Sequence, residues 1–473
     1  MRVVLIKPPV SSYSRLISKV EVPAFPLDIA YLAAYLKANG IEVSTIDLVA
    51  EPFREETLRE SLLRILPDVV GITTYTPSIF KAHSLARLAK QSIPEVKVIF
   101  GGHHASALPE ELLKDKDVDY AVIGEGEATF LELLKSLEEK RDASSVKGIA
   151  FYENGKFIRT PQRPLIQDLD ALPFPERQFL PLERYNVHIT RYKGRGRSGS
   201  LMASRGCCFE CSFCSKAVFG ESYRYRSVDN VMEELFLMRQ KYGISQVTFH
   251  DNLFTFKRDF TLRLCQRMSS EKLGINWTCQ TRVNLIDEEL LYFMKKAGCT
   301  QINFGIESGC EEILQGLSNK MISKDMVRQA VALCRKNKIG FECGFIFGHP
   351  DETIEMAKES IAFAKELKPN IASFFLLTPM PGTPYYRIAE ERGVVDPAKY
   401  DRLISLPDKE PVFVISKMSP KELLEIQRRA YREYYFSFSY LLRRFSKLRS
   451  FMDIKNNLAG LFTILLLKKR EAK

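Results

Sequence analysis

Three cysteines in one short segment are the strongest chemical feature of the sequence. Cys207, Cys211 and Cys214 are spaced C-x3-C-x2-C and directly follow a short apolar stretch. Cysteine thiolates hold iron–sulfur clusters, and four irons normally take four protein ligands. Three thiolates at this spacing can seat a four-iron cluster and leave one iron open, as catalytic metal sites keep a position open. The spacing therefore predicts a cluster whose open iron chelates a substrate or a cofactor.

Zinc binding, a disulfide and a purely structural role each fit this segment less well. Structural zinc needs four ligands, but Cys208 directly adjoins Cys207 and the segment contains no histidine. A disulfide conflicts with a reducing compartment. Buried structural cysteines are common, and we assign most of the later cysteines to that class: Cys265, Cys279, Cys299, Cys310, Cys334 and Cys343.

The cysteine segment lies at the start of a region in which apolar strands alternate with helical segments. The strands are expected at residues 200–204, 245–250, 275–280, 300–306, 341–347 and 371–377. Six β/α units fit a partial barrel better than a closed eight-unit barrel. Polar or glycine-rich turns follow these strands, at the edge where α/β sheets bind ligands.

This region resembles the radical S-adenosylmethionine (SAM) enzymes, in which a C-x3-C-x2-C segment follows the first strand of a partial barrel. Phe213 supplies the aromatic residue that is usual before the last cysteine. The resemblance implies that SAM chelates the open iron of a [4Fe–4S] cluster and is cleaved to a 5′-deoxyadenosyl radical. It also implies SAM contacts at the strand ends, and the candidates are Phe213, Asp251, Arg282, Glu307, Ser308 and Gly348. We expect His250 and His349 to be turn residues.

The first 140 residues also alternate strands with helices. Strands are expected at residues 3–6, 41–46, 69–73, 96–100 and 120–123, with a helix over 27–38 that ends at Gly40. Such a pattern predicts a parallel sheet covered by helices on both faces.

This part resembles the cobalamin-binding Rossmann-like domain that is fused to many radical SAM enzymes. The matching segments are Lys7-Pro8-Pro9, residues 26–33, Gly101–Ala105 and Gly124–Glu127. Glycines at strand ends let the backbone approach a large flat ligand. The candidate cobalamin contacts are Thr73, Thr74, Thr76, Gly101, Gly102, His103, Gly124, Glu125 and Gly126.

One departure from the cobalamin pattern has chemical consequences. The D-x-H-x-x-G signature, which supplies a histidine to cobalt, is absent, and Val49 stands where we expect that histidine. We therefore expect no cobalt ligand from this motif, and we expect His103 and His104 to be turn or amide-contact residues. A plain nucleotide or flavin domain is the alternative.

The predicted domain order follows from these patterns. A Rossmann-like cobalamin-binding domain (1–140) precedes a linker (141–198), which contains a tight hairpin at Asn154-Gly155. The partial radical SAM barrel spans 199–390, and a basic helical region spans 391–473. The fold class is therefore α/β with a helical C-terminal region.

Charge and hydropathy exclude several classes of function. The net charge is +11, but residues 440–473 contain nine Lys or Arg and two Asp or Glu, so most of the excess lies in the tail. A uniformly basic nucleic-acid binder is therefore excluded. Apolar runs of about ten residues are too short for a membrane span, which needs roughly 20. The N-terminus has no secretory signal, so we expect a cytoplasmic protein.

The basic tail has two interpretations. Leu441, Phe445, Leu448 and Met452 share one helical face, which is typical of a helix lying in an anionic membrane interface. The other interpretation is a helical subdomain packed on the barrel with a solvated basic face. Membrane contact would favour a lipid-like substrate.

Together these patterns predict a cobalamin-dependent radical SAM enzyme that methylates an unactivated carbon of a hydrophobic small molecule. An electron donor of the flavodoxin or ferredoxin type would reduce the cluster. The alternative is oxidative cyclisation or another carbon–carbon bond formation on a tetrapyrrole or lipid, as in the anaerobic magnesium-protoporphyrin monomethyl ester cyclases. An RNA-modifying methylthiotransferase is disfavoured because no cysteine precedes residue 207.

Overall fold

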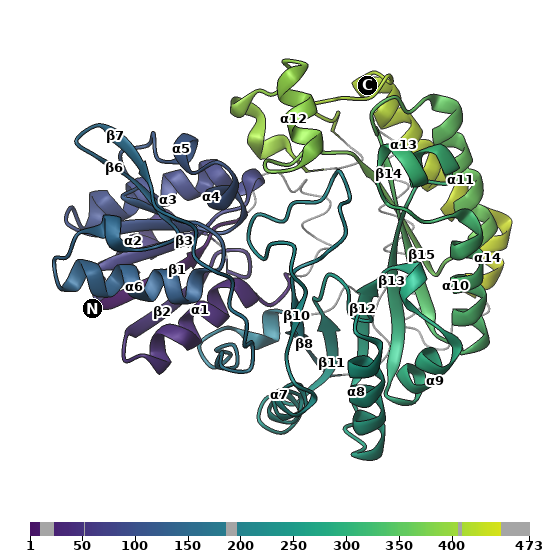
Figure 1. The fold of residues 1–473 in the computed structure, drawn as a ribbon, viewed down its shortest axis with the longest axis horizontal. Coiled ribbons are helices and arrows are strands. Elements are labelled where there is room, and N and C mark those ends of the chain that lie inside the picture. Colours follow the sequence, from purple (N-terminus) through teal and green to yellow (C-terminus); the bar gives the residue numbers. More distant parts are fainter. Residues whose placement is uncertain (10–22, 52, 186–195, 405–408, 446–473) are drawn as a thin grey trace.

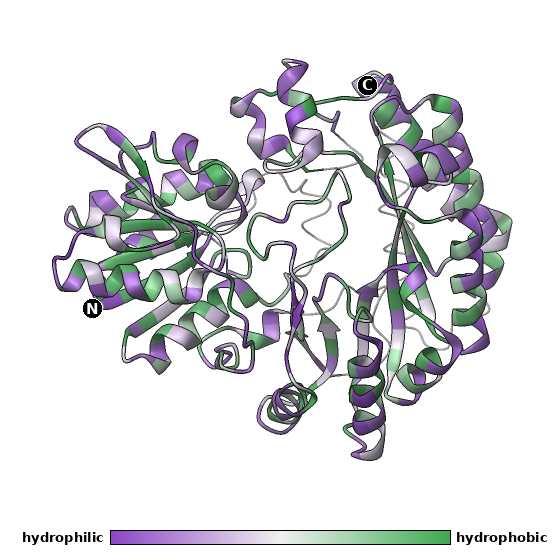
Figure 2. Cartoon of the chain, in the orientation of Figure 1, coloured by the Kyte–Doolittle hydropathy of each residue, from purple (hydrophilic) through white to green (hydrophobic). Residues whose placement is uncertain are grey.

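Two sheets, one in each half of the chain, organise the molecule (Figure 1). The computed structural model describes residues 1–9, 23–51, 53–185, 196–404 and 409–445. Apolar strands of both sheets lie beneath helices whose outer faces are hydrophilic (Figure 2). The α/β class expected from the sequence is confirmed.

The N-terminal sheet has seven strands in the order β2-β1-β3-β4-β5-β6-β7. Its first five strands pair in parallel, and β6 and β7 pair antiparallel. The strands are β1 (Arg2–Lys7), β2 (Glu42–Asp47), β3 (Val69–Thr73), β4 (Lys97–Gly101), β5 (Tyr120–Val122), β6 (Ile149–Glu153) and β7 (Lys156–Arg159). The helices are α1 (Leu27–Ala38), α2 (Glu55–Ile65), α3 (Ile79–Ser92), α4 (His103–Ala107), α5 (Pro109–Leu112) and α6 (Gly126–Glu138).

The β6–β7 hairpin turns at Asn154 and Gly155, both with left-handed backbones at φ 50° and 76°, as the sequence predicts. Its place in the fold differs from the expectation. Val122 of β5 pairs with Ile149 of β6, so the hairpin extends the N-terminal sheet past residue 140. The sequence pattern assigned this hairpin to the linker because pairing partners do not show in local periodicity.

The second sheet is the predicted partial barrel. Its six parallel strands have the order β15-β14-β13-β12-β11-β8, which leaves both edges open. The strands are β8 (Arg197–Leu201), β11 (Ile244–Phe249), β12 (Asn276–Thr281), β13 (Cys299–Glu307), β14 (Gly340–Phe347) and β15 (Ile371–Leu376). A short antiparallel ribbon, β9 (Ser204–Arg205) with β10 (Arg224–Tyr225), follows β8.

The barrel helices begin just beyond the turns that end the strands. They are α7 (Val228–Gln240), α8 (Arg258–Ser270), α9 (Glu288–Lys296), α10 (Lys324–Lys336), α11 (Ile354–Leu367) and α12 (Pro384–Glu391). Side chains of Ser227, Asp287, Ser323 and Thr353 cap four of these helices by accepting backbone N–H bonds. These caps fix where each turn ends and therefore where the turn side chains lie.

The barrel core lies between the sheet and its helices. Trp277, which is 1% exposed, packs against Phe249 and Phe254 and donates its indole N–H to the Ala297 carbonyl at 2.8 Å. A second apolar cluster joins the two halves, since Tyr385 and Tyr400 belong to the same cluster as Phe100 of β4. The two sheets therefore form one packed body.

The last described helices lie on the barrel. After α13 (Pro420–Tyr435), α14 (Phe438–Phe445) packs through Tyr440, whose ring lies 5.4 Å from Tyr434 and 4.8 Å from Tyr435. This packing agrees with the helical-subdomain interpretation for the start of the tail. Residues 446–473, with Leu448 and Met452, lie outside the described residues. Within the described part of the chain, none of the helices has the length and apolarity that a bilayer crossing requires.

Candidate active site between the two domains

The cysteine segment forms a loop that turns sharply after β9. Gly206 has φ 86°, and a Cβ at this position would lie 2.0 Å from the Ser222 carbonyl oxygen, so only glycine fits. Further along the loop, the Ser212 N–H donates to the Ser318 carbonyl at 3.1 Å. The Tyr385 N–H donates to the Ser212 carbonyl at 3.1 Å. The loop is thus held by the backbone on both sides.

The three predicted cluster ligands lie within electrostatic reach of one another. Cys211 is buried, Cys207 is half-buried and Cys214 is exposed at its surface. Although part of the Cys214 side chain is exposed, desolvation of its thiol, together with the neighbouring Cys211 and Cys207, raises its pKa to about 11. Nearby Lys320 acts in the opposite direction.

The donor set suits a cluster rather than a single ion. Across the described residues, no three His, Cys, Asp or Glu side chains are arranged to hold one metal ion. The thiols that hold a cluster lie farther apart than the ligands of a single ion, because each cysteine binds a different iron. The three thiols also have no histidine or carboxylate among them, as iron–sulfur ligation favours. All six later cysteines are buried, as expected for structural residues.

Arg282 lies against the cysteine loop. Its guanidinium is 3.8 Å from the ring centre of Phe209, and Nη1 is 3.6 Å from the sulfur of Cys211. Nη2 donates to the Lys320 carbonyl. With only 4% exposure, Arg282 supports the loop in this structure, whereas the sequence predicts a SAM carboxylate partner here.

A buried ion pair beside the loop was missed by sequence reasoning. Lys320 Nζ donates to Glu307 Oε1 at 2.8 Å, and Nζ also lies 5.8 Å from the ring centre of Phe213. Glu307 follows a β-bulge and has a left-handed backbone, φ 70°. The pair places an ammonium and a carboxylate beside the thiols, the two charges that complement a zwitterionic amino acid. No pattern singles out Lys320, because a nonlocal turn brings it there.

Asp251 and Ser308 are engaged inside the protein. The Asp251 carboxylate accepts the Ala203 N–H at 3.1 Å and the Ser204 hydroxyl, and burial raises its pKa to about 6. It therefore braces the start of the cysteine loop. Ser308 is fully buried and its hydroxyl lies 3.1 Å from that of Ser360.

Gly348 and the two predicted turn histidines lie at strand ends. The Gly348 N–H donates to Glu352, and its φ is 102°. His349 is fully buried and its Nδ1 lies 3.1 Å from the Tyr385 hydroxyl. His250 Nε2 lies 2.9 Å from the Ser200 hydroxyl.

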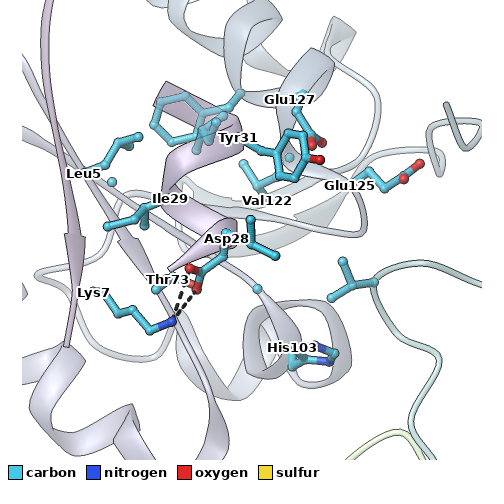
Figure 3. A pocket seen from close by; sticks show the side chains of 18 of the residues that line it. Leu5, Lys7, Asp28, Ile29, Tyr31, Thr73, His103, Val122, Glu125 and Glu127 are labelled. Atoms are coloured by element: carbon cyan, nitrogen blue, oxygen red, sulfur yellow. Dashed lines mark hydrogen bonds and ion pairs between the residues drawn. The ribbon is translucent and has the colours of Figure 1, made fainter. Parts of the chain in front are cut away.

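A cavity of about 450 Å³ lies between the two domains. The carboxyl ends of β1, β3, β4 and β5 and the start of α1 form one wall (Figure 3). The other wall comes from the barrel domain, through Met202, Arg205, Val218, Phe219 and His250. The predicted cobalamin residues that line it are Thr73, Gly101, Gly102, His103, Gly124, Glu125 and Gly126.

Thr74 and Thr76 lie behind this wall, unlike the expectation. The Thr74 hydroxyl donates to the Gly101 carbonyl at 2.8 Å, and the Thr76 hydroxyl lies 3.1 Å from His104 Nδ1. Both threonines are buried, and they tie the turn after β3 to the turn after β4. Alternation of side chains beyond a strand end is not regular, so the sequence does not show which threonine faces the ligand.

A polar network on the cavity wall was not predicted. Asp28, in the first turn of α1, accepts bonds from Lys7 at 3.2 Å, Thr73 at 3.2 Å and Tyr75 at 3.1 Å (Figure 3). Burial is the largest single influence and raises the pKa of Asp28, but Lys7, the Ile29 N–H and Tyr75 together hold the pKa below the ordinary value. The His103 ring stacks on Tyr75 at 5.6 Å, and burial lowers the pKa of His103.

The shape of the cavity depends on glycines. A Cβ at Gly71 would lie 2.8 Å from Leu5 Cδ2 and 3.0 Å from the Phe130 ring. A Cβ at Gly102 would lie 2.9 Å from the Thr74 carbonyl oxygen. The backbone cradle, the apolar floor and the polar rim fit a large ring ligand with amide arms. Val49, in the turn directly after β2, is not among the residues that line this cavity.

Comparisons with known proteins agree with this geometry. Residues 13–134 match the B12 binding domain and residues 201–364 match the radical SAM superfamily. An uncharacterized methyltransferase of Pyrococcus horikoshii is 32% identical over 466 residues, which cover 98% of each chain. The chain belongs to the radical SAM enzymes that carry a B12-binding domain. It is therefore an enzyme, and its cofactors are SAM, a [4Fe–4S] cluster and cobalamin.

Other relatives of this radical SAM enzyme differ in their named reactions. The anaerobic magnesium-protoporphyrin IX monomethyl ester cyclase of Rubrivivax gelatinosus is 31% identical, covering 94% of this chain and 80% of that one. Among solved structures, the methyltransferase TsrM from Kitasatospora setae has a TM-score of 0.74 at 20% identity, covering 99% of this chain and 100% of that chain. At that identity TsrM shares the fold, and the individual SAM and cobalamin contacts of this enzyme remain predictions.

Proposed function

We propose that this enzyme transfers a methyl group to an unactivated carbon of a hydrophobic small molecule. The observation that carries the proposal is the shared cavity, whose walls come from the B12-binding domain and from the segment around the cysteine loop. When bound, the cluster supplies the electron that cleaves SAM, and cobalamin supplies the methyl group. Relatives named as methyltransferases support this direction.

The residues of the chain supply containment and charge at this site. Met202, Val218 and Phe219 present apolar surface on the barrel side of the cavity. Such walls exclude water and protect reactive species from side reactions. The Lys320–Glu307 pair and Arg282 order the charges around the cysteine loop.

A lipid-like substrate is the finer part of the proposal. The hopanoid C-3 methylase of Methylococcus capsulatus is 28% identical over 389 residues. On α14, Phe438 is 77% exposed and Leu442 is 54% exposed, and Arg443 and Arg444 adjoin Leu442 in the sequence. Apolar and cationic side chains together suit contact with an anionic membrane surface, from which a lipid would be drawn. A flavodoxin- or ferredoxin-type protein is the proposed electron donor.

Oxidative cyclisation is the second candidate, because relatives named as cyclases match most of this chain. The two reactions change the composition of the product differently. Methylation adds the methyl group of SAM, whereas oxidative ring closure removes hydrogen and adds no carbon from SAM.

The test is anaerobic reconstitution with iron, sulfide and cobalamin, followed by incubation with strong reductant, a lipid extract and SAM deuterated in its methyl group. We expect 5′-deoxyadenosine and a product heavier by one deuterated methyl group. Cys211→Ala should abolish both, and Cys208→Ala, which alters an exposed neighbour outside the spacing, should retain both. Cleavage of SAM with an unlabelled, dehydrogenated product would replace methylation by cyclisation.

A further inference from the structure

A buried network of ion pairs joins the two domains at the cavity wall. Arg205 of β9 donates through Nη1 to Glu125 Oε1 at 2.9 Å and through Nη2 to Glu127 Oε1 at 2.6 Å. Arg224 of β10 donates through Nη1 to both oxygens of Glu125, at 2.9 and 2.8 Å. These four side chains are at most 8% exposed. We call this network the interdomain latch.

The latch has further partners around Glu125 and Arg205. The Ile166 N–H donates to Glu125 Oε2 at 2.8 Å, so both oxygens of this carboxylate are occupied. The Arg205 guanidinium lies 5.2 Å from the ring centres of both Tyr31 and Phe219, which line the cavity. Glu125, a predicted cobalamin contact that lines the cavity, also directs its carboxylate to the other domain.

The electrostatics favour the charged form of Glu127. Burial is the largest single influence and raises the pKa of Glu127, but the charge and hydrogen bond of Arg205, a backbone N–H and the charge of Arg224 together hold the pKa below its ordinary value. A bidentate guanidinium sets orientation as well as charge, because its two N–H donors are fixed in one plane. The latch therefore defines both a distance and an angle between the domains.

The latch binds the chain directly before the predicted cluster ligands. Arg205 lies two residues before Cys207, and Gly206 between them has no space for a side chain. Arg205 also pairs with Arg224 across the β9–β10 ribbon. On the other side, Glu125 and Glu127 flank Gly126 at the start of α6, in the cavity wall.

We propose that Arg205 is a positioning residue that aligns the cysteine loop with the cobalamin cavity by bridging Glu125 and Glu127. The iron–sulfur site and the cavity are then two parts of one rigid unit. The proposal rests on the cofactors of the family and is independent of whether the product is methylated or cyclised.

The test compares Arg205→Met with a matched variant, Arg177→Met. Arg177 is 1% exposed and pairs with buried Glu234 at 2.5 Å, so it is an equally buried ion pair, but it does not line the cavity. Each reconstituted enzyme is assayed for iron content, for hydroxocobalamin affinity by absorbance titration, and for the EPR spectrum of the reduced cluster with SAM, with and without hydroxocobalamin.

We expect Arg205→Met to keep four irons per chain, to bind hydroxocobalamin at least tenfold more weakly, and to lose the response of the EPR spectrum to hydroxocobalamin. Arg177→Met should resemble the wild type in all three measurements. Arg205→Lys, which keeps the charge but not the fork, should recover part of the affinity and little of the spectral response.

Glu127→Gln provides the same test with a smaller change, should Arg205→Met not fold. It should weaken hydroxocobalamin binding and reduce the spectral response in the same direction. Wild-type affinity and spectra in Arg205→Met or Glu127→Gln, or a wild-type cluster spectrum that is unaffected by hydroxocobalamin, would overturn the proposal. A labelled methyl product, in contrast, bears only on the proposed reaction.

Discussion

Two turns of the molecule place a buried glutamate after a parallel strand, with opposite electrostatic results. Glu127 follows β5 in the B12-binding domain, and Arg205 holds its pKa below the ordinary value although burial opposes this. Glu352 follows β14 in the barrel, and burial raises its pKa to about 7. Glu352 accepts the N–H groups of Gly348 and His349 through Oε2, while its Oε1 has no hydrogen-bond partner in the described structure.

The difference shows that local sequence does not determine the charge state of such a residue. Both turns contain glycine and glutamate, and both suggest ligand binding when read along the chain. Glu127 is ionised because the barrel domain brings an arginine to it, whereas Glu352 meets only backbone donors. The first carboxylate joins two domains, and the second stabilises its own turn.

The largest effect should follow from removing a carboxylate of the interdomain latch. Glu125→Ala leaves Arg224 buried without its carboxylate, and breaking a buried pair costs about 3–5 kcal/mol of unfolding free energy. Urea denaturation at pH 7 measures this. As a control, Glu132→Ala removes a carboxylate of α6 that pairs with Arg163. Glu132 is 39% exposed, so this substitution should cost less than about 1 kcal/mol of unfolding free energy. Equal losses of unfolding free energy in the two variants would show that the buried latch stabilises the protein no more than an exposed ion pair does.

Glu352 should make the protein less stable as the pH rises, which is opposite to the effect of a carboxylate whose pKa is lowered on folding. Because its pKa rises from 4.5 to about 7 on folding, its contribution to stability is full below pH 4.5 and is lost as the pH rises through about 7. The total change is about 3 kcal/mol. Unfolding free energies measured from pH 5 to 8 should fall in the wild type relative to Glu352→Gln. Parallel pH profiles for the two proteins would contradict the assignment of a neutral Glu352.

The floor of the cavity in the first domain should depend on the space that its glycines leave. Gly71→Ala places a Cβ against Leu5 and Phe130, and overpacking of this kind costs about 1–3 kcal/mol. We expect hydroxocobalamin affinity to fall about tenfold in equilibrium dialysis, which corresponds to about 1.4 kcal/mol. Gly316→Ala, where no atom lies within 4 Å of the added Cβ and which does not line the cavity, should bind nearly as the wild type does. A wild-type affinity in Gly71→Ala would place the ligand away from this floor.

The smallest effect should come from Tyr75, which extends the comparison to a third buried carboxylate. Tyr75→Phe removes one of the hydrogen bonds to Asp28 and leaves Lys7 and Thr73 in place. We expect a loss of about 1 kcal/mol near pH 7 in urea denaturation. Because the pKa of Asp28 is lowered on folding, the stabilisation is present above its ordinary pKa of 3.8 and is lost at lower pH. A difference between variant and wild type that persists unchanged in acid would contradict this role.

The patterns of the sequence were sufficient for the elements and for the cofactor that the cysteine spacing implies. The expected helix over 27–38 matches α1, and the six barrel strands differ from the expected ranges by only a few residues. Apolar periodicity is a local property, so it predicts elements well. The spacing of Cys207, Cys211 and Cys214 is likewise local, and comparison with relatives supports the cofactor it implies.

The places of individual side chains depended on nonlocal contacts. The sequence did not show that Asp251 and Arg282, both predicted SAM contacts, also brace the cysteine loop. The ion pairs of Lys320 and Asp28 were not expected, because their partners lie 13 residues or more away in the chain. Thr73 lines the cavity, whereas Thr74 lies behind the cavity wall. Both lie at the end of β3, where side chains no longer alternate regularly between the two faces of the sheet.

The sequence by itself determined the order of strands and helices, the turns at their ends and the thiol set, since each depends on neighbours in the chain. Only the tertiary structure decided that the β6–β7 hairpin completes the first sheet and that one cavity is shared by both domains. It also decided which buried carboxylates are charged. Coulombic interaction and desolvation depend on distance in space, and folding alone sets the distance between Arg205 and Glu127.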